Sequence, residues 1–222
     1  MGIIDAFANW LIDHEAHYGG VQKVPLGQIS PYDARSERVL RKKREEGARG
    51  GDRMAWHGYA RDYARSLIDH FDLDAVGPIR GRHVVVELGV LRGHGLALLC
   101  DLFPESRVIG LDLDVGQFTG NCEALRTLGA FAGTVPEIHA FDELAPDASA
   151  RLQDILAGDA IDVFIDDAAH YDDAVLRAFE VAGPSLRQGY LYFIEDNATA
   201  RQKLSVWHRP AGLLTILSGA AA

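Results

Sequence analysis

Residues Ile161–Asn197 read IDVFIDDAAHYDDAVLRAFEVAGPSLRQGYLYFIEDN, and this stretch decides how the chain folds. It holds two apolar runs, each ending abruptly in carboxylates, with one amphipathic helix pattern between them. Apolar runs of this kind are typical of buried strands in a parallel sheet. The stretch therefore predicts a strand–helix–strand unit.

The acidic ends of the two runs predict a site. Neighbouring parallel strands lie about 4.8 Å apart. Asp167, Glu195 and Asp196 should therefore converge at the carboxyl edge of the sheet, where open α/β sheets bind ligands. Crowded carboxylates repel one another unless a proton or a cation joins them. His170, three residues past Asp167, should stand over the same place.

The same alternation of strand and helix patterns begins at residue 83. Strands are predicted at 83–88, 107–113, 137–141, 162–166 and 190–194. Such alternation forces crossover connections and a doubly wound, Rossmann-like α/β fold with a mostly parallel sheet. Residues 212–219, GLLTILSG, could supply one more strand.

We expect two parts in the chain: a helical N-terminal extension over residues 1–80 and the sheet domain over 81–222. Within the extension, the charged segment 31–46 indicates a solvated helix. A further helix is predicted to begin near Met54, with Tyr59 at one end of its apolar face.

Composition limits the function classes. The 222 residues carry a net charge of −10, which argues against nucleic acid as the main partner. No apolar run reaches the roughly 20 residues of a membrane span. The N-terminus carries acids where a secretory signal has basic residues. Two cysteines, Cys100 and Cys122, fit reduced thiols better than a disulfide. We expect a cytoplasmic protein.

The turn after the first predicted strand reads VELGVLRGHG. Its E-x-G-x-x-x-G-x-G spacing does not match the G-x-G-x-x-G of dinucleotide-binding turns. Gly89 and Gly93 would let the backbone approach a ligand closely. Glu87 adds an acceptor aimed at a cation or a donor. The turn suits a positively charged or hydroxyl-rich ligand better than a pyrophosphate; a tight turn without a ligand is the alternative.

Two further acids follow predicted strands. Asp112 ends the second strand, where a carboxylate typically takes ribose hydroxyls. Asp114 is its rival, and capping of the next helix is the alternative for either one. Asp142, after the third strand, is placed to contact the edge of an adenine base. A role in the turn alone, without a ligand, is an equally open alternative for Asp142.

Together these residues resemble the class I S-adenosylmethionine-dependent methyltransferases over residues 83–197. VELGVLRGHG is similar to the family's first motif and VIGLDLD to its second. Within residues Ile161–Asn197, the segment FIDDAAHYDDAVLRAFEVAGPSLRQGYLYFIEDN resembles the magnesium-dependent sugar O-methyltransferases of macrolide biosynthesis and the cephalosporin-hydroxylase-like proteins. That resemblance implies Asp167, Glu195 and Asp196 as metal ligands and His170 as the base.

The residues also suggest the chemistry directly. Carboxylate ligands select hard cations such as Mg²⁺, Mn²⁺ or Ca²⁺. A bound cation lowers the pKa of a coordinated hydroxyl, and His170 would then remove the proton before the oxygen attacks the sulfonium methyl. The sequence does not fix the register of this strand, so Asp166 stays open as a metal ligand in place of Asp167. Helix capping is the alternative for the acids, and fits Asp172 and Asp173 best.

The expected acceptor is a sugar-bearing or polyhydroxylated small molecule of secondary metabolism. An aminosugar N-methyltransferase, a catechol O-methyltransferase and a non-catalytic protein that binds S-adenosylmethionine or metal stay open. We expect no nucleic-acid partner and no membrane, and a homo-oligomer is open. Trp56, His57 and Tyr59 lie in a segment that resembles the family's cofactor- and substrate-proximal region. They predict a lid, with an amphipathic helix packed on the sheet as the alternative.

Overall fold

The computed structural model describes residues 2–19, 53–55, 57–197, 199–200, 203–204 and 213–216. The predicted charged helix at 31–46 and the side chain of Trp56 lie outside these residues. Within them, no helix is long and apolar enough to cross a membrane.

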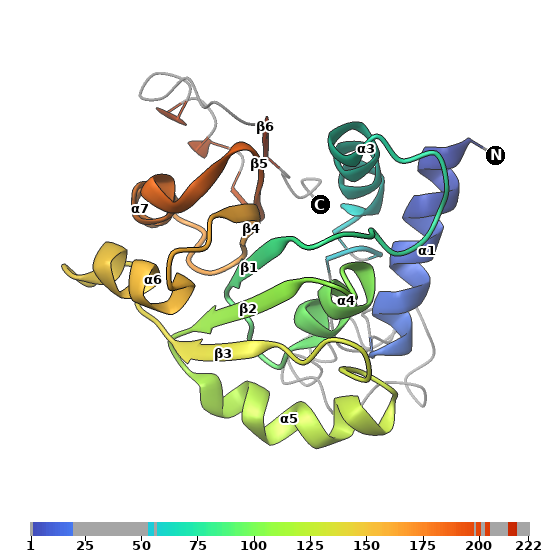
Figure 1. The fold of residues 1–222 in the computed structure, drawn as a ribbon, viewed down its shortest axis with the longest axis horizontal. Helices are drawn as coiled ribbons and strands as arrows, with labels where there is room; N and C mark the ends of the chain where they lie inside the picture. Colours follow the sequence, from blue (N-terminus) through green and yellow to red (C-terminus); the bar gives the residue numbers. More distant parts are fainter. Residues whose placement is uncertain are drawn as a thin grey trace, which may run out of the picture.

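In the described part of the chain, the core is a six-stranded parallel sheet in the order β3-β2-β1-β4-β5-β6 (Figure 1). This is the strand order of the Rossmann fold, with the switch point between β1 and β4. The strands are β1 Val84–Leu88, β2 Arg107–Asp112, β3 Glu137–Ala140, β4 Ile161–Asp166, β5 Leu186–Ile194 and β6 Leu213–Ile216. The predicted α/β fold and parallel sheet are confirmed, and the run at 212–219 supplies β6 beside β5.

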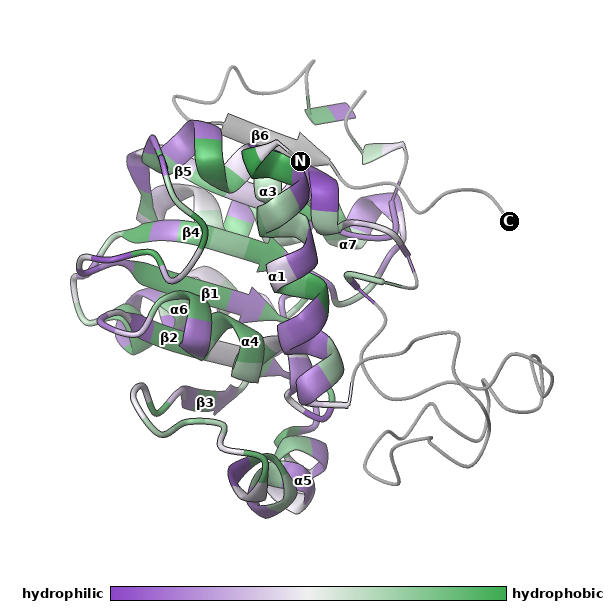
Figure 2. Cartoon of the chain, turned by 90° about the vertical axis from the view of Figure 1, so that its right-hand side faces the viewer, coloured by the Kyte–Doolittle hydropathy of each residue, from purple (hydrophilic) through white to green (hydrophobic). Residues whose placement is uncertain are grey.

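Helices cover both faces of the sheet. The helices are α1 Ile3–His17, α3 Ala60–Phe71, α4 His94–Leu102, α5 Val115–Thr127, α6 Ala148–Leu156 and α7 Asp172–Ala182, with the short 3-10 helix η2 Gly183–Ser185. One buried cluster joins α1, α3 and α4 to the sheet, and a second joins α6 and α7 to the opposite face. Figure 1 shows α1 and α3 on one side of the sheet and α7 on the other, and Figure 2 views the molecule from the side of α1.

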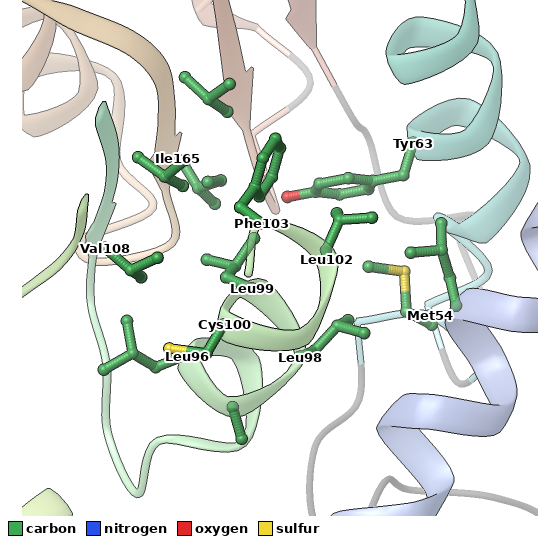
Figure 3. Packing of buried hydrophobic residues seen from close by; sticks show 14 of the residues in the cluster. Met54, Tyr63, Leu96, Leu98, Leu99, Cys100, Leu102, Phe103, Val108 and Ile165 are labelled. Atoms are coloured by element: carbon green, nitrogen blue, oxygen red, sulfur yellow. The ribbon is translucent and has the colours of Figure 1, made fainter. Parts of the chain in front are cut away.

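The N-terminal helices share a core with the sheet. Phe7 and Leu11 of α1 and Tyr63 and Leu67 of α3 are fully buried in the same cluster as the apolar residues of α4. Figure 3 shows Tyr63 together with Leu99 and Leu102 of α4 in this cluster. The ring of Tyr63 stacks on Phe193 of β5, with centroids 4.0 Å apart. Aromatic pairs of this kind contribute about 0.5–1.5 kcal/mol beyond the area they bury. The stack therefore fixes α3 over β5, next to the acidic end of that strand.

Strand pleating determines which acids face the N-terminal helices. Side chains alternate between the faces of a sheet, so residues two apart share a face. Val85, Ile165 and Phe193 pack in the cluster of α1, α3 and α4. By alternation, the residues two positions further on, Glu87, Asp167 and Glu195, are expected on that same face.

Candidate active site

A cavity of about 550 Å³ lies at the carboxyl edge of the sheet, where the turns after β1, β2, β3 and β4 meet. Its described lining includes two arginines, Arg53 and Arg92, against six carboxylates. The carboxylates are Glu15, Glu87, Asp112, Glu143, Asp167 and Asp196. This imbalance makes the cavity strongly anionic, so it suits a cationic ligand or a metal ion.

The turn after β1 brings the backbone close to the turn after β4. Gly89 has a φ of 93° and donates its N–H to the carbonyl of Leu111 at 2.8 Å. A Cβ at this position would lie 2.3 Å from the carbonyl oxygen of Asp167. Only glycine meets both demands, and Gly89 lines the cavity as predicted.

Replacing Gly89 with alanine should destabilise the protein by more than the roughly 1–3 kcal/mol that a strained backbone conformation costs alone, because the new methyl group also overlaps the Asp167 carbonyl. Gly129 is the matched control, since it has the same φ of 93° with nothing within 4 Å of its Cβ position. Urea unfolding should show the larger loss for Gly89→Ala. Equal losses of unfolding free energy in Gly89→Ala and Gly129→Ala would show that the contact with the Asp167 carbonyl has no effect.

Two predicted cofactor residues have local structural roles. Gly93, with a φ of 83°, caps α4 and leaves no room for a Cβ against Phe118, at 2.4 Å. It is not among the described residues that line the cavity. Asp142 accepts the N–H of Leu144 at 2.9 Å, which is the turn role left open above. Its neighbour Glu143 lines the cavity instead.

Asp112 lines the cavity and also shapes the β1–α4 turn. Its Oδ2 accepts the N–H groups of Val90 and Leu91 at 2.8 and 2.7 Å. Its Oδ1 accepts the N–H of Asp114 at 2.8 Å. A carboxylate has about four acceptor sites, so Asp112 retains capacity for a ligand hydroxyl. Asp114 accepts the N–H of Gly116 and caps α5, so the capping role that was open for either acid belongs to Asp114.

The central feature of the site is a buried arginine that sequence analysis missed. Arg53 is 6% exposed and lies among the three carboxylates that face the N-terminal helices. Its Nη2 lies 2.8 Å from Glu87 Oε1 and 3.1 Å from Asp167 Oδ2. Its Nε lies 2.5 Å from Glu195 Oε1. One guanidinium therefore joins the ends of β1, β4 and β5.

One positive charge does not balance three carboxylates. Burial raises the pKa of Glu87 to about 7, although Arg53 acts in the opposite direction. Burial likewise raises the pKa of Glu195 well above its usual range, against the pull of Arg53. Oε2 of Glu87 has no hydrogen-bond partner among the described residues, although it is buried. The cluster has a deficit of positive charge that a proton or a further cation would relieve.

Glu195 has a neighbour besides Arg53. The hydroxyl of Tyr63 donates to Glu195 Oε1, so Tyr63 does more than pack on the sheet. The carboxylate is 2% exposed. It is therefore engaged on the inner side of the cluster, away from solvent.

Asp196 points to the outer side of the cluster. It has a left-handed backbone conformation, with a φ of 55°, a region that aspartate tolerates better than most residues. The hydroxyl of Tyr59 donates to its Oδ1, and Nδ1 of His57 lies 3.6 Å from that same oxygen. Two of the three predicted lid residues thus contact a predicted metal ligand. Closure of a lid stays a prediction.

Asp167, His170 and Asp196 come together at the mouth of the cavity. Each offers a ligand atom within 4.8 Å of the others. Among the described residues, these three side chains are close enough together to bind one metal ion. The ligand set implied by the sequence shares Asp167 and Asp196 with this trio but has Glu195 in place of His170. Asp167 lines the cavity, whereas Asp166 is 3% exposed and belongs to the opposite face of the sheet.

Comparison with known proteins gives distant likenesses. No protein-family model matches the chain, and no curated protein matches it. Among solved structures, the MycE methyltransferase of mycinamycin biosynthesis, in complex with Mg, SAH and mycinamycin VI, is 20% identical over 76% of this chain, with a TM-score of 0.47. This chain spans 38% of that one.

A carbonyl reductase from Pseudomonas aeruginosa is 16% identical over 60% of this chain and 78% of its own, with a TM-score of 0.47. A fibrillarin/Nop5p complex is 18% identical over 50% of this chain and 48% of its own, with a TM-score of 0.38. The matched structures include methyltransferases and reductases.

Proposed function

We propose that this protein is an S-adenosylmethionine-dependent methyltransferase that uses a divalent cation to methylate a hydroxyl of a sugar-bearing or polyhydroxylated small molecule. The observation that carries the proposal is the anionic cavity with Asp167, His170 and Asp196 at its mouth. It combines a pocket for a cationic cofactor with a carboxylate pair for a metal and a base beside it.

The charge of the cavity favours S-adenosylmethionine over a dinucleotide. S-adenosylmethionine carries a sulfonium and an ammonium group, which the carboxylates of Glu87 and Asp112 would attract. A dinucleotide carries a pyrophosphate, which six lining carboxylates would repel. Asp112 lies at the end of β2, where it would take the ribose hydroxyls. Phe141 and Glu143 of the β3–α6 connection line the cavity and would supply an apolar and an acceptor surface for the adenine.

The residues at the mouth fit a hard divalent ion. Asp167 and Asp196 offer carboxylate oxygens, and magnesium in proteins is typically bound by one or two carboxylates with waters and substrate in its other positions. A bound ion of this kind would lower the pKa of a substrate hydroxyl. Asp167 is held by Arg53 and Asp196 by Tyr59, so both carboxylates are positioned in advance.

His170 is assigned as the general base. It lies within 4.8 Å of both carboxylates and is exposed at the mouth, where the acceptor would enter. It would take the proton of the hydroxyl as the oxygen attacks the methyl group. His57 and Tyr59 lie on the same side through their contacts with Asp196. They would cover the acceptor and exclude water.

The test is product formation. The protein is incubated with S-adenosylmethionine and a panel of glycosylated and polyhydroxylated acceptors, with Mg²⁺ or with EDTA. Products are identified by mass spectrometry. The proposal predicts a methylated product that forms with Mg²⁺ and is lost in EDTA. A full rate in EDTA would refute the metal-assisted mechanism, and hydride transfer from a nicotinamide cofactor would refute the methyltransferase assignment.

A further inference from the structure

Arg53 comes from a short segment that is anchored on two sides. The carboxylate of Glu15 in α1 accepts the N–H of Met54 at 3.1 and 3.0 Å and that of Ala55 at 3.3 Å. The carbonyl of Arg53 accepts the N–H of Tyr59, at the start of α3, at 3.2 Å. The guanidinium is therefore held in place by its backbone as well as by its ion pairs.

Arg53 divides the acidic cluster into two halves. The inner half consists of Glu87 and Glu195, each 1–2% exposed and each paired with Arg53. The outer half consists of His170 and Asp196, at the mouth of the cavity. Asp167 belongs to both halves, because its Oδ2 lies 3.1 Å from Arg53 while the residue also belongs to the outer trio.

We propose that Arg53 is an internal counter-cation: it keeps Glu195 bound within the inner half, confines a divalent ion to the outer half, and lowers the affinity of that ion by competing for Asp167. Like charges repel over the short distances within such a cluster. An arginine suits this role because its guanidinium stays charged when buried and its fork can reach several carboxylates at once. The inference rests on the proposed metal site and adds a positioning residue to it.

The experiment measures Mn²⁺ binding by calorimetry and by electron paramagnetic resonance, which report on the metal independently of turnover. Arg53→Met removes the charge while it keeps an unbranched side chain. We expect Mn²⁺ affinity to rise at least tenfold, because Asp167 and Glu195 both lose their competitor. Arg53→Lys retains the charge and should stay within a fewfold of wild type.

A second variant keeps the test valid if Arg53→Met does not fold, since a buried carboxylate without its partner is costly. Arg53→Met/Glu87→Gln removes one positive and one negative charge, and it should also bind Mn²⁺ at least tenfold more tightly. Folding is checked by circular dichroism. Unchanged or weaker binding by a folded variant that lacks Arg53 would overturn the inference. Absence of Mn²⁺ binding by the wild type would instead overturn the proposed metal site.

Gly95 provides a steric test with no change of charge. A Cβ on Gly95 would lie 2.3 Å from Glu87 Oε1 and 2.6 Å from Arg53 Nη1, so Gly95→Ala must displace the ends of these two side chains. Gly120, in α5, has nothing within 4 Å of its Cβ position and is the matched helix control. Mn²⁺ affinity should change at least threefold in Gly95→Ala and stay constant in Gly120→Ala. Unchanged Mn²⁺ affinity in Gly95→Ala would also count against the inference.

Discussion

Replacing His170 with alanine should slow methyl transfer by roughly 10²–10⁴-fold, the usual contribution of a general base. Asp167 and Asp196 remain in the variant, so binding of the metal ion and of S-adenosylmethionine should be retained. The measurement is single-turnover kinetics with saturating cofactor and Mg²⁺, together with a Mn²⁺ titration. A rate effect without an affinity effect identifies an interaction made in the transition state.

The Mn²⁺ titration separates two roles for His170, because its ring also has the geometry of a ligand. A tenfold or larger loss of Mn²⁺ affinity in His170→Ala would make the histidine a ligand and contradict its assignment as the base. His83→Ala is the matched control. His83 precedes β1 at the opposite edge of the sheet, where its ring contacts Phe71 and the carbonyl of Arg80. That variant should retain the wild-type rate.

Replacing Asp166 with asparagine should stabilise the protein at alkaline pH by several kcal/mol, with about 6 kcal/mol as the upper bound. Asp166 is 3% exposed, and its Oδ2 has no hydrogen-bond partner among the described residues. Burial raises the pKa of this carboxyl from 3.8 to about 8, with a further contribution from Glu143. The folded protein therefore keeps Asp166 protonated at neutral pH.

The raised pKa determines how the free energy of unfolding changes with pH. Between pH 4 and pH 8 the folded state holds a proton that the unfolded state has released, so wild-type stability falls as the pH rises through this window. Asparagine has no such proton. The free energies of unfolding of Asp166→Asn and wild type should therefore be close at pH 4 and should diverge by pH 8.5 in urea titrations.

Glu137→Gln is a control of opposite sign. A hydrogen bond with Arg107 lowers the pKa of Glu137, so the contribution of this carboxylate is present above its ordinary pKa and is lost on acidification. Glu137→Gln should therefore be less stable than wild type at neutral pH, and the difference should shrink at low pH. A constant difference between Asp166→Asn and wild type from pH 4 to pH 8.5 would show that Asp166 titrates normally.

The first five strands were predictable, because each is a short apolar run next to a helix pattern; their order across the sheet came from the structure. The acids at their ends were predictable for the same reason, since parallel strands end at one edge. The alternation of side chains along β5 also predicts which face of the sheet each acid is on. Glu195 shares a face with Phe193, whereas Asp196 does not. The inner position of Glu195 follows from this period of two.

Arg53 was not predictable from the local pattern. It lies 34 residues before Glu87 and 142 before Glu195, in a segment whose anchors are a carboxylate of α1 and the start of α3. Its role depends on long-range packing, which no local periodicity encodes. One signal in the sequence is an imbalance of charge, because three carboxylates on one buried face call for a proton or a cation beside them. The turn roles of Gly93 and Asp142 depend likewise on a neighbouring helix and on local hydrogen bonds.

Whether the anionic cavity binds S-adenosylmethionine is tested most directly by calorimetry. The protein is titrated with S-adenosylmethionine and, separately, with NAD⁺, each in the presence of Mg²⁺. We expect saturable binding of S-adenosylmethionine that weakens at least tenfold in Glu87→Gln, and no measurable binding of NAD⁺. Binding of NAD⁺ with no heat from S-adenosylmethionine would contradict the account, and would show that the carboxylates at the ends of β1 and β2 do not select a cationic cofactor.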